Sequence, residues 1–177
     1  MDENFLIERA AGGDESSFRI LLERYKNKIF ALCFRYLGNY EDAEDAAQET
    51  VIKIYRALPG FSHRSAFSTW VYSIAKNTCL DMIKKKKTDT ESIDELDFML
   101  GDARQDTEGD ALRNDDIRRL REIINSLPRE NREILILREV DGFSYEEISE
   151  VLGIPLGTVK SRLARAKTAV CERFEVE

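Results

Sequence analysis

The chain has 177 residues, a formal net charge of −7 and a hydrophobic content of 42%, enough for one medium domain or two small ones. It has no apolar run as long as a membrane span and opens with acids rather than the basic segment of a signal peptide, so we expect a cytoplasmic protein. Cys33, Cys79 and Cys171 are widely spaced and form no metal-ligand cluster with the single histidine, so we expect reduced, structural thiols and neither metal nor cofactor.

The first 87 residues are predicted to form four helices. A short helix covers Glu3 to Ala11 and stops at the glycine pair that follows. Asp14 caps a long second helix, which ends at Gly38 and carries apolar residues at spacings of three and four. These residues are Phe18, Leu22, Tyr25, Ile29, Leu32, Cys33 and Tyr36. Their spacing predicts one face directed to the core.

The third helix, capped by Asn39, is predicted to have an acidic outer face. Its inner face consists of Ala43, Ala46, Ala47, Val51, Ile54 and Tyr55. Its outer face in the first turns consists of Glu41, Asp42, Glu44, Asp45 and Glu49 and includes no base. Acids in a first turn suit the helix dipole, but five without a base exceed that need. The pattern therefore indicates a docking surface for a basic partner.

A loop separates the third helix from the fourth. A proline and a glycine break the chain, residues 61–64 form the loop, and Ser65 is expected to cap the fourth helix. Aromatic residues interleaved with bases are typical of a site for single-stranded nucleic acid, because bases stack on rings while cations follow the phosphates. On periodicity alone, Phe67 and Trp70 are more often core residues. Phe61, in the loop, is the better candidate for stacking.

Residues 88–113 are predicted to form a flexible acidic linker between two domains. Residues 88–116 contain eleven acids against two arginines, a net charge of −9, whereas the rest of the chain is slightly positive. The segment lacks a sustained apolar period and follows a run of four lysines. The negative charge of the chain is therefore concentrated between the two domains.

The second domain, residues 114–177, is also predicted to be helical. One helix is expected to run to Leu127-Pro128 and another to Asp141-Gly142. Their apolar faces are lined by Ile117, Leu120, Ile123, Ile124, Ile134, Leu137 and Val140. Two further helices follow. Ser144 and Glu147 have the spacing of a capping box, which marks a helix start. Gly153 and Pro155 then provide a stop and a restart within three residues, so the pattern predicts a helix-turn-helix.

The final helix has one face to bury and one face of small residues and cations. The inner side is formed by Val159, Leu163, Ala166 and Val170. The outer side is formed by Ser161, Ala164, Arg165 and Thr168, with Lys160 and Lys167 on one edge and Thr158 and Arg162 on the other. Small residues allow close approach to the DNA major groove, arginine can read a guanine edge, and flanking cations meet phosphates. The alternative is a solvated basic face on an ordinary helical hairpin, but the turn favours DNA binding.

Three motifs carry a family resemblance. They are residues 45–50 in the acidic helix, residues 65–77 in the fourth helix and residues 157–163 in the last. In this order and spacing they resemble the extracytoplasmic-function (ECF) group of bacterial RNA polymerase sigma factors. The expected fold is all-α, with two small helical domains (1–87 and 114–177) joined by the acidic linker.

The resemblance implies a role for each group of residues. A surface for the clamp helices of the largest polymerase subunit is formed by Glu41, Asp42, Asp45, Gln48 and Glu49. A site for the melted minus-ten element is formed by Phe61, Arg64, Trp70, Lys76 and Asn77. The reader of the minus-thirty-five element is formed by Thr158, Lys160, Ser161, Arg162, Ala164, Arg165 and Lys167.

The same resemblance implies further partners. These are the flap of the second-largest polymerase subunit, promoter DNA in both double- and single-stranded form, and an anti-sigma factor. The linker would thread the active-site channel of the polymerase. The implied function is promoter recognition, strand opening and transcription initiation for a stress- or envelope-responsive set of genes.

Three other functions fit parts of the sequence. A carboxylate-bridged metal enzyme would need Glu-x-x-His pairs on facing helices, whereas the only histidine, His63, lies in the loop. An adaptor that only tethers proteins is disfavoured by Arg165 and Lys160 on an otherwise small-residue face. A transcriptional regulator that binds duplex DNA without polymerase, usually as a dimer, stays open, because a helix-turn-helix alone does not exclude it.

Overall fold

The computed structural model describes residues 2–89 and 111–175, and side chains over 2–86 and 115–175. Within these ranges the chain forms helices and no strand: α1 (Glu3–Ala11), α2 (Glu15–Leu37), α3 (Tyr40–Ala57), the 3₁₀ turn η1 (Leu58–Gly60), α4 (Phe67–Asp89), α5 (Ala111–Asn125), α6 (Arg129–Glu139), α7 (Tyr145–Leu152) and α8 (Leu156–Glu175). The chain divides into two compact units, Met1–Asp97 and Phe98–Glu177. The predicted all-α, two-domain class is confirmed. Of the predicted linker, residues 90–110 lie outside the described residues.

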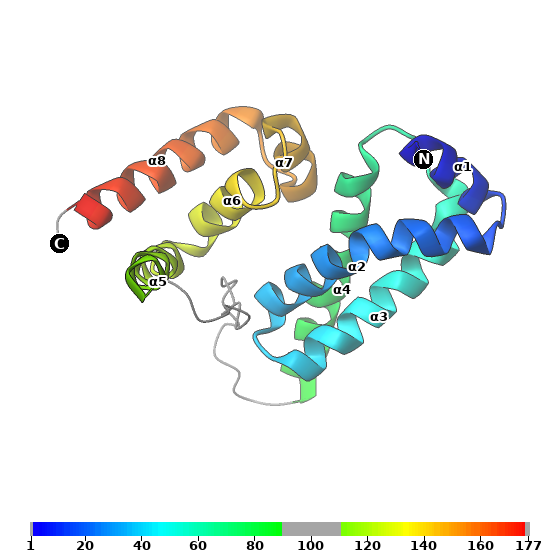
Figure 1. The fold of residues 1–177 in the computed structure, drawn as a ribbon, viewed down its shortest axis with the longest axis horizontal. Helices are drawn as coiled ribbons and strands as arrows, with labels where there is room; N and C mark the ends of the chain where they lie inside the picture. The colour runs from blue at the N-terminus through cyan, green and yellow to red at the C-terminus, as the bar shows by residue number, and fades with distance from the viewer. Residues whose placement is uncertain (1, 90–110, 176–177) are drawn as a thin grey trace. The chain divides into compact units, whose positions relative to one another are not determined.

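In the first unit three long helices pack against one another. α2 and α3 lie side by side, α4 contacts both, and α1 packs against α2 (Figure 1). The core between the three long helices includes Leu21, Ile29, Leu32, Ala43, Ala46, Ile54, Phe67, Val71 and Ala75. Ala43 and Ala46 are fully buried, and their small side chains let the backbone of α3 lie close to its neighbours.

The predicted caps of α2 and α3 are confirmed. The Asp14 carboxylate accepts a hydrogen bond from the Ser17 amide at 3.2 Å, which satisfies one of the free amides of the first turn. Gly38 ends α2 in the left-handed region, with φ 74°. The Asn39 side chain then accepts from the Asp42 amide at 2.9 Å and starts α3.

Two predictions for the first unit, the cap of the fourth helix and the position of Tyr55, are wrong. α4 begins at Phe67, and the Ala66 carbonyl accepts its first hydrogen bond from the Trp70 amide, so Ser65 lies one residue before the N-cap position. Tyr55, predicted on the inner face of α3, is 46% exposed. Its ring lies at the rim of the interface between α2 and α3, edge-on to Phe18 with ring centroids 4.9 Å apart.

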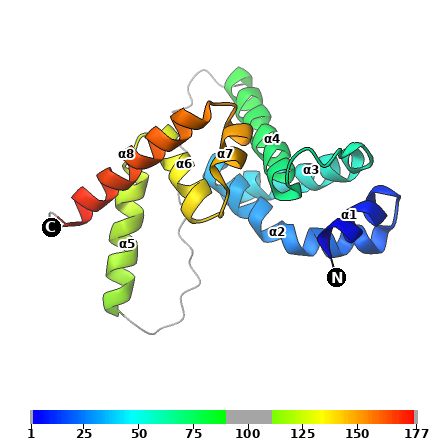
Figure 2. The ribbon, with the colours of Figure 1, turned by 90° about the horizontal axis from the view of Figure 1, so that it is seen from above.

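In the second unit α6 is the central helix. Its four consecutive residues 134–137 are all buried, and the helix packs against both α7 and α8. α8 also packs against α5 and α7 (Figure 2). Val140, predicted on the apolar face, is 60% exposed because it is the C-cap residue beyond the last turn of α6. Ile117 and Leu120 of α5 are also exposed, since their apolar stripe is wider than the contact with α8.

The helix-turn-helix forms as predicted. The Ser144 hydroxyl accepts from the Glu147 amide at 3.1 Å, while the Glu147 carboxylate accepts from the Ser144 amide at 2.8 Å, so the capping box is complete. Gly153 ends α7 with φ 64°. α8 begins at Leu156, directly after Pro155. The short turn thereby sets the position of α8 against α7.

The described residues contain no helix of the length and apolarity needed to cross a bilayer. They also contain no group of three potential metal-ligating side chains among His, Cys, Asp and Glu. All three cysteines are free thiols, and Cys33 and Cys79 are fully buried. The contact with the Cys33 thiol, together with burial, raises the pKa of Cys79 well above its ordinary value, so this thiol stays protonated.

Candidate functional site

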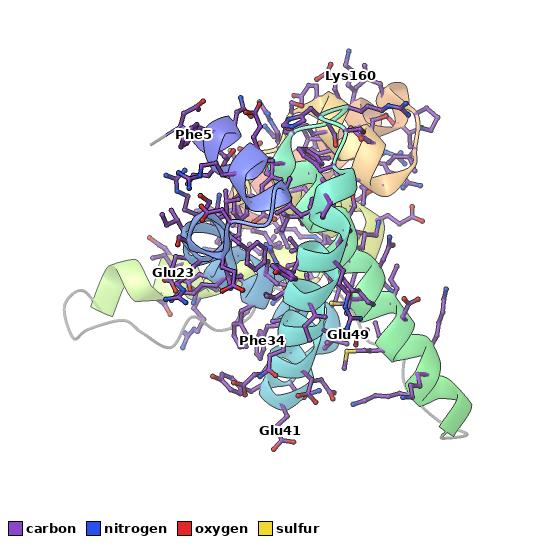
Figure 3. All side chains as sticks on the ribbon, turned by 90° about the vertical axis from the view of Figure 1, so that its right-hand side faces the viewer. Phe5, Glu23, Phe34, Glu41, Glu49 and Lys160 are labelled. Carbon is purple, nitrogen blue, oxygen red and sulfur yellow. The ribbon has the colours of Figure 1, made fainter. Side chains whose placement is uncertain are left out.

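The acidic face of α3 is open to solvent along most of its length. Glu41, Asp45, Gln48 and Glu49 are all exposed, and Figure 3 shows Glu41 near the start of α3 and Glu49 about two turns further along. Glu49 makes an ion pair with Lys53, one turn later on the same helix, at 2.8 Å. The face therefore offers carboxylates and an amide to a partner.

Asp42 differs from the rest of this face. It is half-buried, and its carboxylate accepts hydrogen bonds from the Lys86 ammonium of α4 and from the Asn39 side chain. Burial acts to raise the pKa of Asp42, but the hydrogen bonds from Lys86 and Asn39 outweigh it and hold the pKa below its ordinary value. Asp42 thus ties the start of α3 to the end of α4.

A groove of about 310 Å³ lies between α2 and α3, beside the acidic face. Its apolar residues are Leu22, Ile29, Phe30, Ala47 and Val51. Its polar residues are Glu23, Lys26, Asn27, Glu44 and Gln48. Because Gln48 belongs to both the groove and the acidic face, the two form one continuous surface. We call this surface, the groove together with the acidic face, the docking surface.

The sequence did not predict the groove, because most of the groove's apolar residues lie on the helix faces that were predicted to point to the core. Leu22, Ala47 and Val51 fall on the predicted inner faces, whereas the structure leaves all three half-buried. A signal was present in the breadth of the apolar stripe on α2, where Leu21 and Leu22 are adjacent. A stripe this wide exceeds what one neighbouring helix covers.

Aromatic rings gather where the loop 61–64 meets the start of α4. Phe61 is half-buried, with its ring centroid 5.0 Å from that of Trp70 and 5.5 Å from that of Phe67. The His63 ring lies 4.7 Å from Phe61. Phe67 is buried, as its periodicity predicted, and Trp70 is half-buried. We call Phe61, His63, Phe67 and Trp70 the ring cluster.

Polar residues extend the ring cluster along α4 and the loop. Asn77 is exposed and lies seven residues after Trp70, hence on the same side of α4. Lys76 is half-buried and projects from the adjacent side of the helix. Arg64 is exposed next to His63 in the loop. The region therefore combines aromatic surface, an amide and cations.

α8 has one buried side and one exposed side. Val159, Leu163 and Ala166 are buried, as predicted, whereas Val170 at the end of the stripe is half-buried. The exposed residues include Lys160, Ser161, Ala164, Arg165 and Lys167, and Thr158 is half-buried. The Nε of Arg165 donates a hydrogen bond to the Ser161 carbonyl at 3.3 Å, so the guanidinium lies along its own helix. Lys160, labelled in Figure 3, projects away from α8.

Two cations at the edges of α8 are paired with acids of α6. Arg162 reaches Glu130 at 2.5 Å, and Lys167 reaches Glu139 at 2.8 Å. The Arg162 side chain is 24% exposed, whereas Lys167 is half-exposed. These pairs join residues more than 25 positions apart, so no local sequence pattern reveals them. Both contacts hold α8 against α6.

The chain matches the family model of sigma-70 region 2 over residues 21–88 and that of sigma-70 region 4 over residues 117–170. It is 36% identical to the ECF RNA polymerase sigma-E factor of Salmonella typhimurium, over 99% of this chain and 95% of that protein. It is 39% identical to the RNA polymerase sigma-H factor of Pseudomonas aeruginosa, over 93% of this chain and 90% of that protein. Among solved structures it is similar to the sigma factor RpoE of Bartonella quintana in complex with the anti-sigma factor NepR. That similarity has a TM-score of 0.69 and 25% identity, over 90% of this chain and 98% of that one.

The two family models fall on different compact units. Region 2 covers most of α2 and all of α3, and region 4 covers the helix-turn-helix. A regulator related only through its helix-turn-helix would not match over the first unit as well. Sigma factors are initiation factors, so the metal-enzyme alternative is also excluded. The chain therefore belongs to the extracytoplasmic-function group of the sigma-70 family of RNA polymerase sigma factors.

Proposed function

We propose that the docking surface, the ring cluster and the exposed side of α8 serve three successive steps of transcription initiation. Residues 1–87 bind core RNA polymerase and open the minus-ten element, residues 114–177 read the minus-thirty-five element, and residues 88–113 join them. The observation that carries this proposal is that α8 has a buried side and an exposed side. Small residues and cations lie exposed on a helix whose opposite side is buried against α6.

The docking surface fits a basic, amphipathic helical partner. An apolar floor can receive the apolar face of a helix, and the neighbouring acids can pair with its cations. We assign this surface to the clamp helices of the largest polymerase subunit, with Asp45, Gln48, Glu49 and Glu41 in direct contact. Asp42, which is bound to Lys86, contributes by holding α3 in place.

The ring cluster fits single-stranded DNA. Phe61 and Trp70 supply ring surface on which an unpaired base can stack, and the Asn77 amide can both donate to and accept from a base edge. Arg64 and Lys76 lie at the sides of this surface, where the phosphates of the strand would pass.

The exposed side of α8 fits the major groove of the upstream element. Arg165 reaches a base edge from a surface on which Ser161 and Ala164 permit close approach. Lys160, Lys167 and Thr158 contact the DNA backbone, and Lys167 exchanges Glu139 for a phosphate when it does so. Arg162 pairs with Glu130 and thereby orients α8. It also lies next to the DNA backbone.

We also propose a cytoplasmic location and regulation by an anti-sigma factor. The Bartonella relative was solved in complex with such a factor. Release of the chain by a stress or envelope signal would then allow it to bind polymerase, including the flap of the second-largest subunit through residues 114–177.

Run-off transcription with core polymerase on a promoter library tests the proposed function. We expect transcripts that depend on this chain and that share an upstream and a minus-ten element. A chain that bound duplex DNA as a dimer, gave no transcript and failed to bind core polymerase would contradict the proposal.

A further inference from the structure

Cys33 of α2 and Cys79 of α4 meet inside the first unit. Both side chains are fully buried, and the two helices that carry them pack against each other. The Cys79 thiol donates a hydrogen bond to the sulfur of Cys33, so the two sulfur atoms are direct neighbours. The two residues are more than 40 positions apart in the sequence, so the packing of the helices brings them together. The first unit therefore contains a contacting pair of thiols.

The surroundings make the two thiols unequal. The hydrogen bond from Cys79 lowers the pKa of Cys33, and although burial acts against it, a hydrogen bond with the Thr50 side chain of α3 acts in the same direction. The contact with Cys33 and burial both raise the pKa of Cys79. Cys33 is therefore the thiol that ionises first, while Cys79 keeps its proton and donates it to the hydrogen bond.

A cation lies at the edge of the pair. The Nζ of Lys53 in α3 donates a hydrogen bond to the hydroxyl of Thr78 at 3.2 Å, and Thr78 directly precedes Cys79. The charge of Lys53 also favours the ionised form of Cys79. Cationic neighbours promote the thiolate, which is the nucleophilic form of cysteine. Two small apolar side chains would fill the same space, so packing alone does not call for two thiols in contact.

We propose that Cys33 and Cys79 form a redox pair, which hydrogen peroxide converts to a disulfide between α2 and α4. In the first step the Cys33 thiolate attacks the peroxide, the O–O bond breaks, and Cys33 becomes a sulfenic acid as hydroxide leaves. In the second step Cys79 gives up its proton, and its sulfur attacks that of Cys33 and displaces a second hydroxide. The two hydroxides take up the two thiol protons. Two thiols thereby lose two electrons, and one peroxide is reduced to two waters.

Burial determines how fast the pair reacts and what the bond does. Buried thiols are shielded from oxidants, so the reaction requires brief local separation of α4 from α2. Because the two sulfur atoms are already neighbours in the folded chain, only a small approach, to about 2.05 Å, forms the bond. The bond closes a loop that contains all of α3, which restricts the unfolded chain. The oxidised first unit should therefore resist unfolding more strongly than the reduced one.

Peptide mapping of the full chain tests the redox pair. The folded protein is treated with hydrogen peroxide, its remaining thiols are blocked in denaturant, and it is digested with trypsin without reductant. Trypsin cleaves on both sides of each cysteine, so the disulfide would link the peptides 29–35 and 77–84. We expect this linked peptide, and its loss after dithiothreitol. We also expect oxidation to raise the unfolding temperature of the first unit by about 5–15 °C, measured by tryptophan fluorescence.

The third cysteine provides the matched control. Cys171 is exposed and lies in the second unit, so Cys171→Ser should form the same linked peptide and gain the same unfolding temperature as the wild type. Cys33→Ala and Cys79→Ala should show neither effect. The mapping of the wild-type chain needs no variant, so it decides the question even if these two fold poorly.

Three results would overturn the redox pair. They are the absence of the linked peptide after peroxide treatment of the folded chain, its formation only when peroxide is added in denaturant, and a link from either buried cysteine to Cys171 in its place. A linked peptide without a rise in unfolding temperature would overturn the stabilising role of the bond. Because transcription is not measured, all of these results are independent of the proposed function.

Discussion

Arg165 and Lys167 are both cations of α8, but their surroundings differ. Arg165 is exposed and hydrogen-bonds to the Ser161 carbonyl of its own helix. Lys167 pairs with Glu139 of α6. Arg165 can therefore extend to a base without giving up a contact between helices, whereas Lys167 must exchange one anionic partner for another. The two side chains should respond to DNA in different ways.

Arg165→Ala is expected to cost ~1–3 kcal/mol of binding free energy and to relax the preference at one base pair of the upstream element. Lys167→Ala is the control, because loss of a phosphate contact should weaken binding to all sequences about equally and lower the salt slope by about one. Affinities for every single-base change, measured at two salt concentrations, distinguish the two. A uniform loss for Arg165→Ala would make Arg165 a phosphate contact.

Glu139→Gln is expected to strengthen binding to all duplex sequences by up to ~1 kcal/mol, the usual range of an exposed ion pair, because it frees Lys167 for a phosphate. Base preference should not change. Glu122→Gln, an exposed acid of α5, gives the same change in net charge without releasing Lys167. Equal gains in both variants would mean that net charge alone is responsible.

At the scale of the helix, α3 has a start that is tied to α4 and an exposed acidic face. Its start is capped by Asn39 and tied to α4 through Asp42 and Lys86. Its acids Asp45 and Glu49 are exposed, and Glu49 makes a surface ion pair with Lys53. A change at Asp42 should therefore affect the stability of the first unit, whereas changes at Asp45 and Glu49 should affect binding.

Reversal of charge in Asp45→Lys with Glu49→Lys is expected to weaken association with core polymerase and to leave the fold intact. A titration with core enzyme measures the affinity, and circular dichroism checks the helices. Glu8→Lys with Glu122→Lys, two exposed acids of α1 and α5, is the matched control for net charge. An affinity equal to that of the control would remove the acidic face from the docking surface.

Asp42→Asn is expected to lower the free energy of unfolding of the first unit at neutral pH. Because the pKa of Asp42 is lower in the folded state, its contribution is present above the ordinary pKa of 3.8 and is lost as pH falls through the folded value. The difference between wild type and variant should therefore shrink below pH 3.8. Fluorescence of Trp70, the single tryptophan, reports unfolding of this unit. A difference that stays constant with pH would contradict a stabilising contribution from the ionised Asp42 side chain.

At the scale of the whole molecule, charge is distributed unevenly. Residues 88–116 hold a net charge of −9, whereas the remaining residues of the chain are together slightly positive. The acids can compete with phosphates for the cations of both units, so the fragment 114–177 is expected to bind promoter DNA more tightly than the full chain. The difference in DNA affinity between the fragment and the full chain should decrease as salt screens the charges. A full chain with the acids of 89–110 changed to amides should match the fragment, and equal affinity of all three proteins would exclude the competition.

Local signals in the sequence were enough to predict the helices and their ends. The contacts at the exposed surfaces depend on how the helices pack, so the sequence did not predict them. Gly38, Gly153 and the Ser144–Glu147 pair each act within a few residues, so their positions in the sequence were enough to place helix ends. The pairing of Asp42 with Lys86 depends on how two helices pack, and periodicity carries no information on that. The left-handed conformation of His63, with φ 55°, likewise has no local signature.

The division of α8 also bears on how such a protein diverges. Substitutions at exposed positions usually change the free energy of unfolding by less than about 0.5 kcal/mol, and Ser161 and Ala164 are exposed opposite the buried Val159 and Leu163. Under the proposed role of α8 in reading the upstream element, changes at these two positions after gene duplication would give one copy a new target while the other keeps the old one. Folding would then place little restraint on the appearance of a second specificity.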